Sequence, residues 1–266
     1  MPFAPSPRSI LITGASSGIG AALALFYAEK GTCLFLSGRN PERLEDTLKA
    51  CRAQGAKAEG QSLDISDGLA CRTWIESCHK KHPLDLVIAN AGISSGRGGK
   101  GESCENMHAI FEVNVMGVVH TALAAIPLMR EKKSGQIALV SSIAGFLGPL
   151  GYAAPAYCAS KAAERIWGES LRPMLYPAGI HINVICPGFV RSRMTATNDF
   201  PMPFLMDGEK AARIIAKGLA RDKARIIFPW QMAVLVRTLD FFLALLPAAA
   251  ADSLVRRLGG APPTTP

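Results

Sequence analysis

The sequence predicts an α/β fold: a single domain with a doubly wound parallel sheet, followed by a C-terminal helical extension. Short apolar runs alternate with longer amphipathic stretches from Ser9 to Phe228, an order that places parallel strands between two layers of helices. The first apolar run leads directly into a glycine-rich turn. The chain of 266 residues also has a suitable length for one domain of this kind.

The first unit is a strand, a turn and a helix. The strand Ser9–Ile12 stops at the turn Thr13–Gly20, and an amphipathic helix is expected to follow through Lys30, capped by Gly31. Backbone amides at a helix N-terminus bind phosphate, and glycines let a pyrophosphate approach the main chain. We therefore expect the turn to hold a dinucleotide through Gly14, Ser16, Ser17, Gly18, Ile19 and Gly20.

The second strand, Cys33–Leu36, bears on the choice of dinucleotide. In a dinucleotide fold the tip of this strand lies beside the adenosine ribose, where a carboxylate suits NAD and a cation suits the 2′-phosphate of NADP. Here Gly38 stands in the position of the carboxylate, and Arg39 supplies a guanidinium fork suited to phosphate. The pattern favours NADP over NAD. The alternative is that Arg39 is an ordinary cation leading the helix that starts at Pro41.

The middle of the chain continues the alternation. Helices are expected over Pro41–Gln54 and from about Gly68 to Lys81, with strands near 57–62 and over Leu84–Ile88. Asp64 and Ile65 form the turn after the third strand, and Ala89-Asn90-Ala91-Gly92 ends the fourth strand. The small residues of this last segment would let a flat adenine or ribose lie against the backbone.

A long helical stretch then runs to about Lys132 and carries Asn114 among apolar residues. A buried asparagine needs hydrogen-bond partners. Asn114 is expected either to secure a local irregularity of this helix or to hold a water molecule near an active site.

Tyr157 and Lys161 form the pair around which the other motifs of the chain are organised. They stand four residues apart near the start of a helix expected to reach about Tyr176, so they share one helix face. A unit charge about 4 Å from the phenol, at an effective dielectric of about 20, would favour the tyrosinate by up to roughly 4 kcal/mol, or about three pKa units. The alternative is a surface aromatic beside a solvated charge. The strand Gln136–Val140 delivers Ser142 to the same end of the sheet.

The last part of the domain contains a strand within Gly179–Cys186, a helix over Asp207–Ala220 and a short strand at Arg225–Phe228. Between the first two of these elements, the stretch from about 189 to 206 is rich in large apolar residues. It is expected to be either a lid over a lipophilic carbonyl substrate or a packed insertion. The residues concerned are Phe189, Phe200, Met202, Phe204, Leu205 and Met206.

Composition and charge pattern argue against several classes of partner, site and protein. The net charge is +8, but no dense Lys/Arg run or basic stripe interleaved with aromatic residues is present, so nucleic acid is not an expected partner. Seven cysteines without a CxxC pair indicate reduced thiols in a cytoplasm-like compartment, and no metal site is expected. No signal peptide is visible, and no apolar run is long enough to predict a transmembrane helix.

These motifs, in this order, resemble the short-chain dehydrogenase/reductase family over roughly residues 9 to 193. The turn Thr13–Gly20 is similar to the cofactor turn of that family, and Asp64–Ile65 to its adenine-side pair. Ala89–Gly92 is similar to a variant of its Asn-Asn-Ala-Gly element. Asn114, Ser142, Tyr157 and Lys161 match its catalytic tetrad, and Pro187, Gly188, Val190 and Ser192 resemble the segment that contacts nicotinamide, with Ser192 in place of the more usual threonine.

The resemblance implies a Rossmann-type domain and hydride transfer between a nicotinamide cofactor, NADP(H) rather than NAD(H), and a carbonyl or alcohol carbon. Tyr157 would be the proton donor or acceptor, with Lys161 lowering its pKa and binding the nicotinamide ribose. Ser142 would hold the substrate oxygen, and Asn114 would position a water linked to Lys161. Ser142 and Tyr157 are further apart than the family pattern, which predicts a small insertion around Phe146–Ala154.

Two other functions stay open at this point. A protein of this fold could sense NADPH or act as a scaffold without turnover, or it could be a lyase or epimerase that consumes no NADPH. A homodimer or homotetramer is expected, because the long helices around Asn114 and Tyr157 leave apolar faces that a two-fold partner could cover.

The C-terminal extension, residues 229–258, is strongly apolar but interrupted by Arg237 and Asp240, with Arg256 and Arg257 near its end. It is expected to pack on its own domain or on another subunit, or to lie in a membrane interface. The proline-rich end, residues 259–266, is expected to be disordered.

Overall fold

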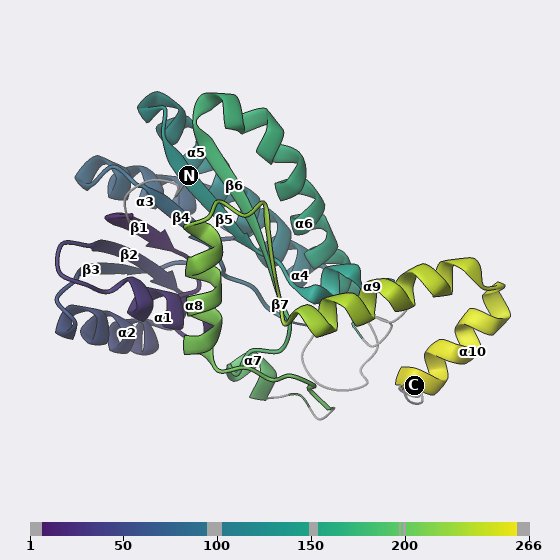
Figure 1. The fold of residues 1–266 in the computed structure, drawn as a ribbon. Coiled ribbons are helices and arrows are strands. Elements are labelled where there is room, and N and C mark those ends of the chain that lie inside the picture. The colour runs from purple at the N-terminus through teal and green to yellow at the C-terminus, as the bar shows by residue number, and fades with distance from the viewer. Residues whose placement is uncertain (1–6, 95–102, 149–153, 197, 199–200, 260–266) are drawn as a thin grey trace.

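The computed structural model describes residues 7–94, 103–148, 154–196, 198 and 201–259 (Figure 1). Seven parallel strands form one sheet in the order β3-β2-β1-β4-β5-β6-β7. The strands are β1 (Ser9–Ile12), β2 (Cys33–Gly38), β3 (Lys57–Ser62), β4 (Leu86–Ala89), β5 (Gly135–Val140), β6 (Ile180–Pro187) and β7 (Arg225–Phe228). The strand order reverses between β1 and β4, which makes their carboxyl ends the expected ligand-binding edge.

Helices cover both faces of the sheet, as the doubly wound prediction requires. One layer contains α1 (Gly18–Tyr27), α2 (Pro41–Ala53) and α8 (Gly208–Leu219), and the other contains α3 (Gly68–Lys81), α5 (Gly117–Lys132) and α6 (Pro155–Leu175). The strands β1, β4, β5 and β6 are buried at every position. This is the burial pattern of parallel strands sandwiched between two helix layers.

The first helix is shorter than predicted. It ends at Tyr27, not at Lys30. The hydroxyl of Thr32 donates to the carbonyl oxygen of Tyr27 at 3.0 Å and accepts from the backbone amide of Glu29 at 3.2 Å. These side-chain bonds replace the next helical turn. Gly31, with a φ of 92°, serves the turn that follows.

The long helical stretch before β5 is irregular, and the irregularity includes Asn114. It divides into α4 (Cys104–Phe111), a π-helical turn η1 (Glu112–Met116) and α5. Asn114 lies within the π-helical turn. By length and composition the run Cys104–Lys132 could cross a membrane, but 56% of its most apolar window is buried inside the domain, as in a core helix.

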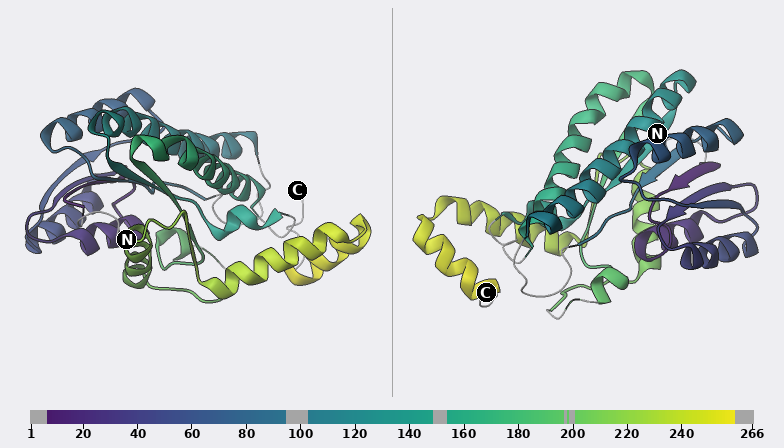
Figure 2. Two further views of the ribbon diagram at one scale, coloured as in Figure 1. Left: turned by 45° about the horizontal axis from the view of Figure 1, so that its top comes forward. Right: turned by 180° about the vertical axis from the view of Figure 1, so that it is seen from behind.

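The chain ends in two helices that extend away from the sheet (Figures 1 and 2). These are α9 (Trp230–Leu245) and α10 (Ala248–Gly259). On α9, Val236 and Leu243 are buried, whereas most of its large apolar residues are exposed. We call residues 230–259, which comprise α9, α10 and the two residues between them, the C-terminal hairpin. Its exposed large apolar residues are Trp230, Val234, Leu235, Phe241, Phe242, Leu245 and Leu246. The expectation that this segment packs on its own domain therefore holds only for a minor part of its surface.

Candidate active site

Ser142, Tyr157 and Lys161 converge where β5 ends and α6 begins. Lys161 Nζ lies 5.9 Å from the centroid of the Tyr157 ring and donates a 3.1 Å hydrogen bond to the carbonyl oxygen of Val140, the last residue of β5. Ser142 follows two residues later; its hydroxyl donates to the carbonyl oxygen of Pro187 at 3.3 Å and accepts from the amide of Ala144 at 3.1 Å. Three groups suited to proton transfer and oxygen binding thus face one point at the ligand-binding edge.

The Tyr157 phenol is harder to ionise than the sequence suggested. Burial raises its pKa above the ordinary value, while the Lys161 ammonium and a hydrogen bond with Ser142 act in the opposite direction. Glu164 adds to the upward shift. The expected effect of Lys161 is present, but desolvation outweighs it in the protein alone. The structure therefore favours the protonated form of the Tyr157 phenol.

Lys161 is paired with a buried carboxylate that sequence reasoning missed. Its Nζ donates to Oε1 of Glu164 at 2.7 Å, and the exposed fractions of the two residues are 4% and 1%. Burial alone would lower the pKa of Lys161, but the charges of Glu164 and Tyr157 hold it above the ordinary value. A signal existed, because a glutamate three residues after the lysine shares its helix face.

Two serines without a role assigned from the sequence hydrogen-bond the main chain of α6. Ser141 is buried, and its hydroxyl donates to the carbonyl oxygen of Lys161 at 2.6 Å. The Ser160 hydroxyl donates to the carbonyl oxygen of Tyr157 at 2.8 Å. Ser160 and Glu164 lie three and seven residues after Tyr157, so spacing along α6 could have identified both.

Asn114 joins the π-helical turn to the rest of the site. Its side-chain oxygen accepts from the amide of Ile93 at 2.8 Å, and its Nδ2 donates to the carbonyl oxygen of Ile93 at 2.9 Å and to the Ser160 hydroxyl at 3.0 Å. Both side-chain N–H groups are thus used. A water held by this side chain could only donate to the remaining lone pair of the oxygen.

The glycine-rich turn after β1 packs closely against the segment that follows β4. Gly14 and Gly18 have φ angles of 68° and 58°, and a Cβ atom on Gly14 would lie 2.7 Å from the Cα atom of Ala91. The Asn90 side chain donates to the carbonyl oxygens of Thr13 at 2.9 Å and Gly14 at 3.1 Å, so β4 holds the turn in shape.

The start of α1 fits the phosphates of a dinucleotide. Its N-cap, Ser17, makes no side-chain capping bond, so the first amides of the helix are left for a ligand. Ser16 lies beside the tip of β2, where a Cβ atom on Gly38 would approach its side chain to 2.9 Å. The remaining turn residues predicted to bind cofactor, Ile19 and Gly20, are the second and third residues of α1.

Arg39 and Asp64 lie together at the tips of β2 and β3. Arg39 is exposed. Burial alone would raise the pKa of Asp64, but hydrogen bonds from Ser66 and the charge of Arg39 hold it below the ordinary value. Ile65 is buried instead, with its side chain against Gly117 of α5. The structure therefore places Asp64 and Arg39 at the surface and Ile65 in the core.

The remaining predicted cofactor residues surround the same edge. Gly92 adjoins the tetrad, since a Cβ atom there would lie 3.2 Å from Asn114 Oδ1 and 3.4 Å from Lys161 Nζ. Ser192 lies against the start of α1, where a Cβ atom on Gly18 would approach its Cβ to 3.0 Å. Pro187 is the last residue of β6, and the amide of Gly188 donates to the carbonyl oxygen of Phe228 at 2.7 Å. Val190 pairs with Met206 in an isolated parallel bridge.

The chain belongs to the short-chain dehydrogenase family. The family match covers residues 8–200, and the protein is accordingly an NAD(P)-dependent oxidoreductase with a Rossmann-type fold. An uncharacterized oxidoreductase of Myxococcus xanthus is 41% identical over 254 residues, which is 95% of this chain and 98% of the relative.

Solved structures agree on the fold. A short-chain dehydrogenase from Sphingobium yanoikuyae in complex with NADPH matches with a TM-score of 0.76 and 25% identity, covering 95% of this chain and 94% of the other. A short-chain dehydrogenase/reductase from Burkholderia phymatum in complex with NAD matches with a TM-score of 0.81 and 24% identity, covering 97% of each chain.

The segment after β6 is only partly described. Met206 packs against the core, whereas Phe204 is 51% exposed with a φ of 59°. Phe200 lies outside the described residues, as do residues 149–153 of the predicted insertion and residues 260–266 of the tail. Of the apolar residues named for this segment, Met206 thus lies against the core and Phe204 at the surface, and the lid stays a prediction.

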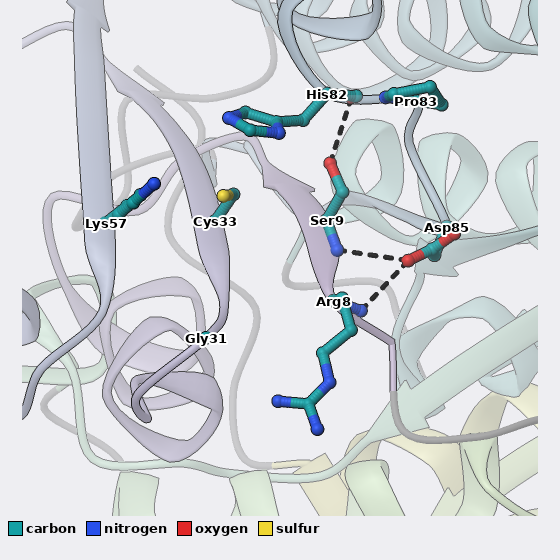
Figure 3. Close-up of a pocket in the computed structure, with 8 residues that line it drawn as sticks. All are labelled: Arg8, Ser9, Gly31, Cys33, Lys57, His82, Pro83 and Asp85. Atoms are coloured by element: carbon teal, nitrogen blue, oxygen red, sulfur yellow. Dashed lines mark hydrogen bonds between the residues drawn. The ribbon is translucent and has the colours of Figure 1, made fainter.

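A hollow of about 360 Å³ lies at the opposite edge of the sheet from the candidate active site (Figure 3). There the Asp85 carboxylate accepts from the amides of Arg8 at 2.9 Å and Ser9 at 3.1 Å, and the Ser9 hydroxyl donates to the carbonyl oxygen of His82 at 3.1 Å. These bonds tie the chain before β4 to the start of β1. The hollow is therefore a structural junction at the amino ends of the strands. No cluster of three metal-binding side chains occurs within the described part of the chain.

Proposed function

We propose that this protein is an NADP(H)-dependent oxidoreductase that interconverts a carbonyl and a secondary alcohol, with Tyr157 as the acid or base. The observation that carries the proposal is the convergence of Ser142, Tyr157 and Lys161 at the carboxyl end of β5, beside the cofactor turn. A bound nicotinamide supplies or accepts the hydride. The protein contributes position, hydrogen bonds and proton transfer.

Each side chain has a distinct part in this scheme. Tyr157 gives its phenolic proton to the developing alkoxide in reduction and takes one in oxidation. Ser142 turns its hydroxyl proton from the Pro187 carbonyl oxygen to the substrate oxygen and stabilises the growing negative charge there. Lys161 stabilises the phenolate that remains and reaches the nicotinamide ribose. Asn114 connects this site to solvent through a water on its remaining acceptor, and its amide holds Ile93 and Ser160 in place.

The preference for NADP rests on Arg39. Its exposed guanidinium stands at the tip of β2, close enough to Asp64 to lower the pKa of that carboxyl group. Gly38 leaves no room for a competing carboxylate, because a side chain there would meet Ser16. A 2′-phosphate would find a cation and no nearby acidic group on β2.

The substrate is proposed to be lipophilic, such as a steroid, a fatty acyl chain or a xenobiotic ketone. Phe204 is exposed in the segment that follows the nicotinamide-contacting residues. The start of α9 adjoins Gly188, one of the residues expected to contact nicotinamide, since a Cβ atom on Gly188 would lie 2.9 Å from Met232 Sδ. Met232 therefore lies against the segment expected to contact nicotinamide, and Phe204 adds an exposed apolar side chain further along that segment.

A homodimer or homotetramer is proposed through α4, α5 and α6. Met107, Leu123, Ile166 and Met174 are exposed on these helices, and α4 packs beside α6. A second copy facing this surface across a two-fold axis would cover these side chains in both subunits.

The C-terminal hairpin is proposed to lie in a membrane interface. Its exposed apolar residues include Trp230, Phe241 and Phe242, and Arg256 and Arg257 are exposed on α10. Aromatic and aliphatic side chains next to cations suit the boundary between acyl chains and anionic headgroups. Because α9 begins beside the active site, a lipophilic substrate could pass from the membrane to Tyr157 over a short distance.

The proposed activity is tested by NADPH absorbance with purified protein and a panel of small aldehydes, aromatic ketones, steroids and 3-ketoacyl thioesters. We expect turnover that Tyr157→Phe abolishes, with NADPH binding by fluorescence nearly unchanged. Product formed without NADPH consumption would instead identify a lyase or epimerase. NADPH binding that alters partner association, with no turnover in either direction, would identify a sensor or scaffold.

A further inference from the structure

Glu164 is a carboxylate buried beside the active site that the family resemblance does not include. It lies one helical turn beyond Lys161 and accepts the 2.7 Å hydrogen bond from its Nζ through Oε1. Its other oxygen, Oε2, is buried and has no hydrogen-bond partner among the residues that the structure describes. Burying a carboxylate with an unused oxygen is costly, so a packing role alone accounts poorly for this residue.

Glu164 changes the charge that Tyr157 experiences. When the carboxylate is ionised, Lys161 and Glu164 form a pair with no net charge, and the ammonium stabilises a tyrosinate only weakly. When the carboxyl is protonated or absent, the full positive charge of Lys161 acts on the phenol. Consistently, Lys161 lowers the pKa of Tyr157 and Glu164 raises it, although burial has the largest effect.

We propose that Glu164 is a positioning residue that offsets the charge of Lys161 and thereby keeps Tyr157 in its protonated, proton-donating form. This inference rests on the proposed function of Tyr157 as the catalytic acid. It extends the predicted tetrad by one residue, which acts through Lys161 and not on the substrate. It also bears on the pH range of carbonyl reduction, because reduction needs a phenol that carries its proton.

The surroundings of Glu164 let its ionisation follow pH. On α6 it faces Lys161 and Tyr157, and from β6 it faces the Cys186 thiol, whose pKa burial raises to about 12. Burial raises the pKa of Glu164 to about 7, and Lys161 opposes this shift. The pair with Lys161 thus passes from net positive to neutral as pH rises through the neutral range.

A second carboxylate of α6, Glu169, has ion-pair partners of its own. The Glu169 carboxylate pairs with Arg165 at 3.4 Å and with Arg225 at 2.5 Å. Glu169 is on the same helix as Glu164 and makes no ion pair with Lys161 among the described residues. It therefore provides a matched control for the loss of one carboxylate from α6.

The test uses Glu164→Gln and Glu164→Met, two neutral side chains of similar length, with Glu169→Gln as control. Tyrosinate ultraviolet absorption is titrated in each variant and in the same variant carrying Tyr157→Phe, so that the difference reports on Tyr157 without substrate or cofactor. We expect both Glu164 variants to ionise Tyr157 at a pH lower by about one unit, from the removal of one nearby charge. Glu164→Asp should retain most of the wild-type behaviour.

The pH profile of kcat/KM for reduction supplies the second readout. The alkaline fall of the profile should move to lower pH in both neutral variants and stay in place in Glu169→Gln. An unchanged tyrosinate midpoint and profile in a folded Glu164→Gln or Glu164→Met protein would overturn the inference, since a purely structural role predicts that result. A shifted midpoint in a protein without any turnover would instead refute the proposed oxidoreductase function.

Discussion

The side-chain amide of Asn114 donates a 3.0 Å hydrogen bond to the hydroxyl of Ser160, which joins the π-helical turn to the helix that carries Tyr157 and Lys161. The same amide also holds the main chain of Ile93 through two bonds. One fully buried side chain therefore fixes three segments around the active site.

The first prediction concerns this junction. Asn114→Ala leaves the Ile93 amide and carbonyl without their partners in a partly buried setting, and each such loss costs about 1–3 kcal/mol where water is excluded. We expect the free energy of unfolding in urea to fall by about 2–4 kcal/mol and turnover to drop as well. Asn106→Ala, at a partly exposed position on α4, should change the stability by less than about 0.5 kcal/mol. Equal stability of the two variants would contradict the bracing role.

The second prediction concerns Asp222, which connects the end of α8 to α6 and β6. Its carboxylate accepts from Arg172 at 2.7 Å, from Asn183 at 3.1 Å and lies 2.7 Å from His181 Nδ1. Burial alone would raise the pKa of Asp222, but these partners hold it below the ordinary value. Asp222→Asn should lower the free energy of unfolding at neutral pH by about 2 kcal/mol.

The lowered pKa of Asp222 also predicts how the stability difference between wild type and Asp222→Asn changes with pH. A carboxyl group whose pKa is lower in the folded state stabilises the fold above its ordinary pKa and loses that contribution as pH falls below it. The difference between wild type and Asp222→Asn should thus shrink in urea titrations carried out below about pH 4. Asp207→Asn breaks only the exposed pair with Arg191 and should cost less than about 1 kcal/mol. A difference that persists at low pH would exclude the charge as its source.

The third prediction concerns Glu164, whose ionisation makes stability change with pH in the direction opposite to that of Asp222. Its pKa is raised from 4.5 to about 7, mainly by burial. The folded state therefore binds more protons than the unfolded state between these values, and stability falls as pH rises through that window. Glu164→Gln should remove this slope between pH 5 and 7, roughly, as measured by thermal unfolding. The Glu169→Gln control should keep it.

Much of this fold was predictable because the responsible patterns are local. The strand at 57–62 and the helix Gly68–Lys81 have the predicted boundaries, since turn and capping residues adjoin the apolar periodicity. The end of α1 was not predictable from its own residues, because Thr32, five positions further on, caps Tyr27. The tetrad positions followed from family motifs, and the structure brings their side chains together.

The electrostatics of the site could not be predicted from spacing. Tyr157 and Lys161 at i and i+4 suggested a lowered phenol pKa, but the amount of water excluded around Tyr157 depends on how α6 packs against the sheet. Glu164 was visible on the same helix face, yet its burial and its bond to Lys161 are tertiary facts. Sequence gives which groups are neighbours, whereas packing decides which of their interactions dominates.

The fourth prediction tests cofactor preference. Arg39→Leu removes the cation proposed to bind the 2′-phosphate, and charge-assisted hydrogen bonds are worth about 1.5–3 kcal/mol. The KM for NADPH should rise by about ten- to a hundredfold, while that for NADH changes little. Gly38→Asp is a poor companion change, because its Cβ would lie 2.9 Å from the Ser16 side chain and disturb the turn. An unchanged ratio of the two KM values would exclude Arg39 from cofactor selection.

The fifth prediction tests the C-terminal hairpin. Phe241 and Phe242 are 62% and 56% exposed on α9, and replacing both by serine removes apolar area while keeping the buried Leu243 that anchors the helix. The wild-type protein should float with vesicles containing anionic phospholipid, and the double variant should stay in solution, because binding scales with the apolar area inserted. The double variant Arg256→Gln/Arg257→Gln should lose more affinity for anionic vesicles than for neutral vesicles.

The competing occupant of this surface is a second copy of the chain, and sedimentation distinguishes the two. If the phenylalanine variant changes the oligomeric state and the wild type never floats with vesicles, the hairpin is a subunit interface and the membrane assignment is wrong. If the variant leaves the oligomeric state intact and loses only vesicle binding, the hairpin is a membrane contact. Leu123→Glu on α5 should disrupt the oligomer and leave vesicle binding intact, because this exposed leucine lies on the proposed dimer face.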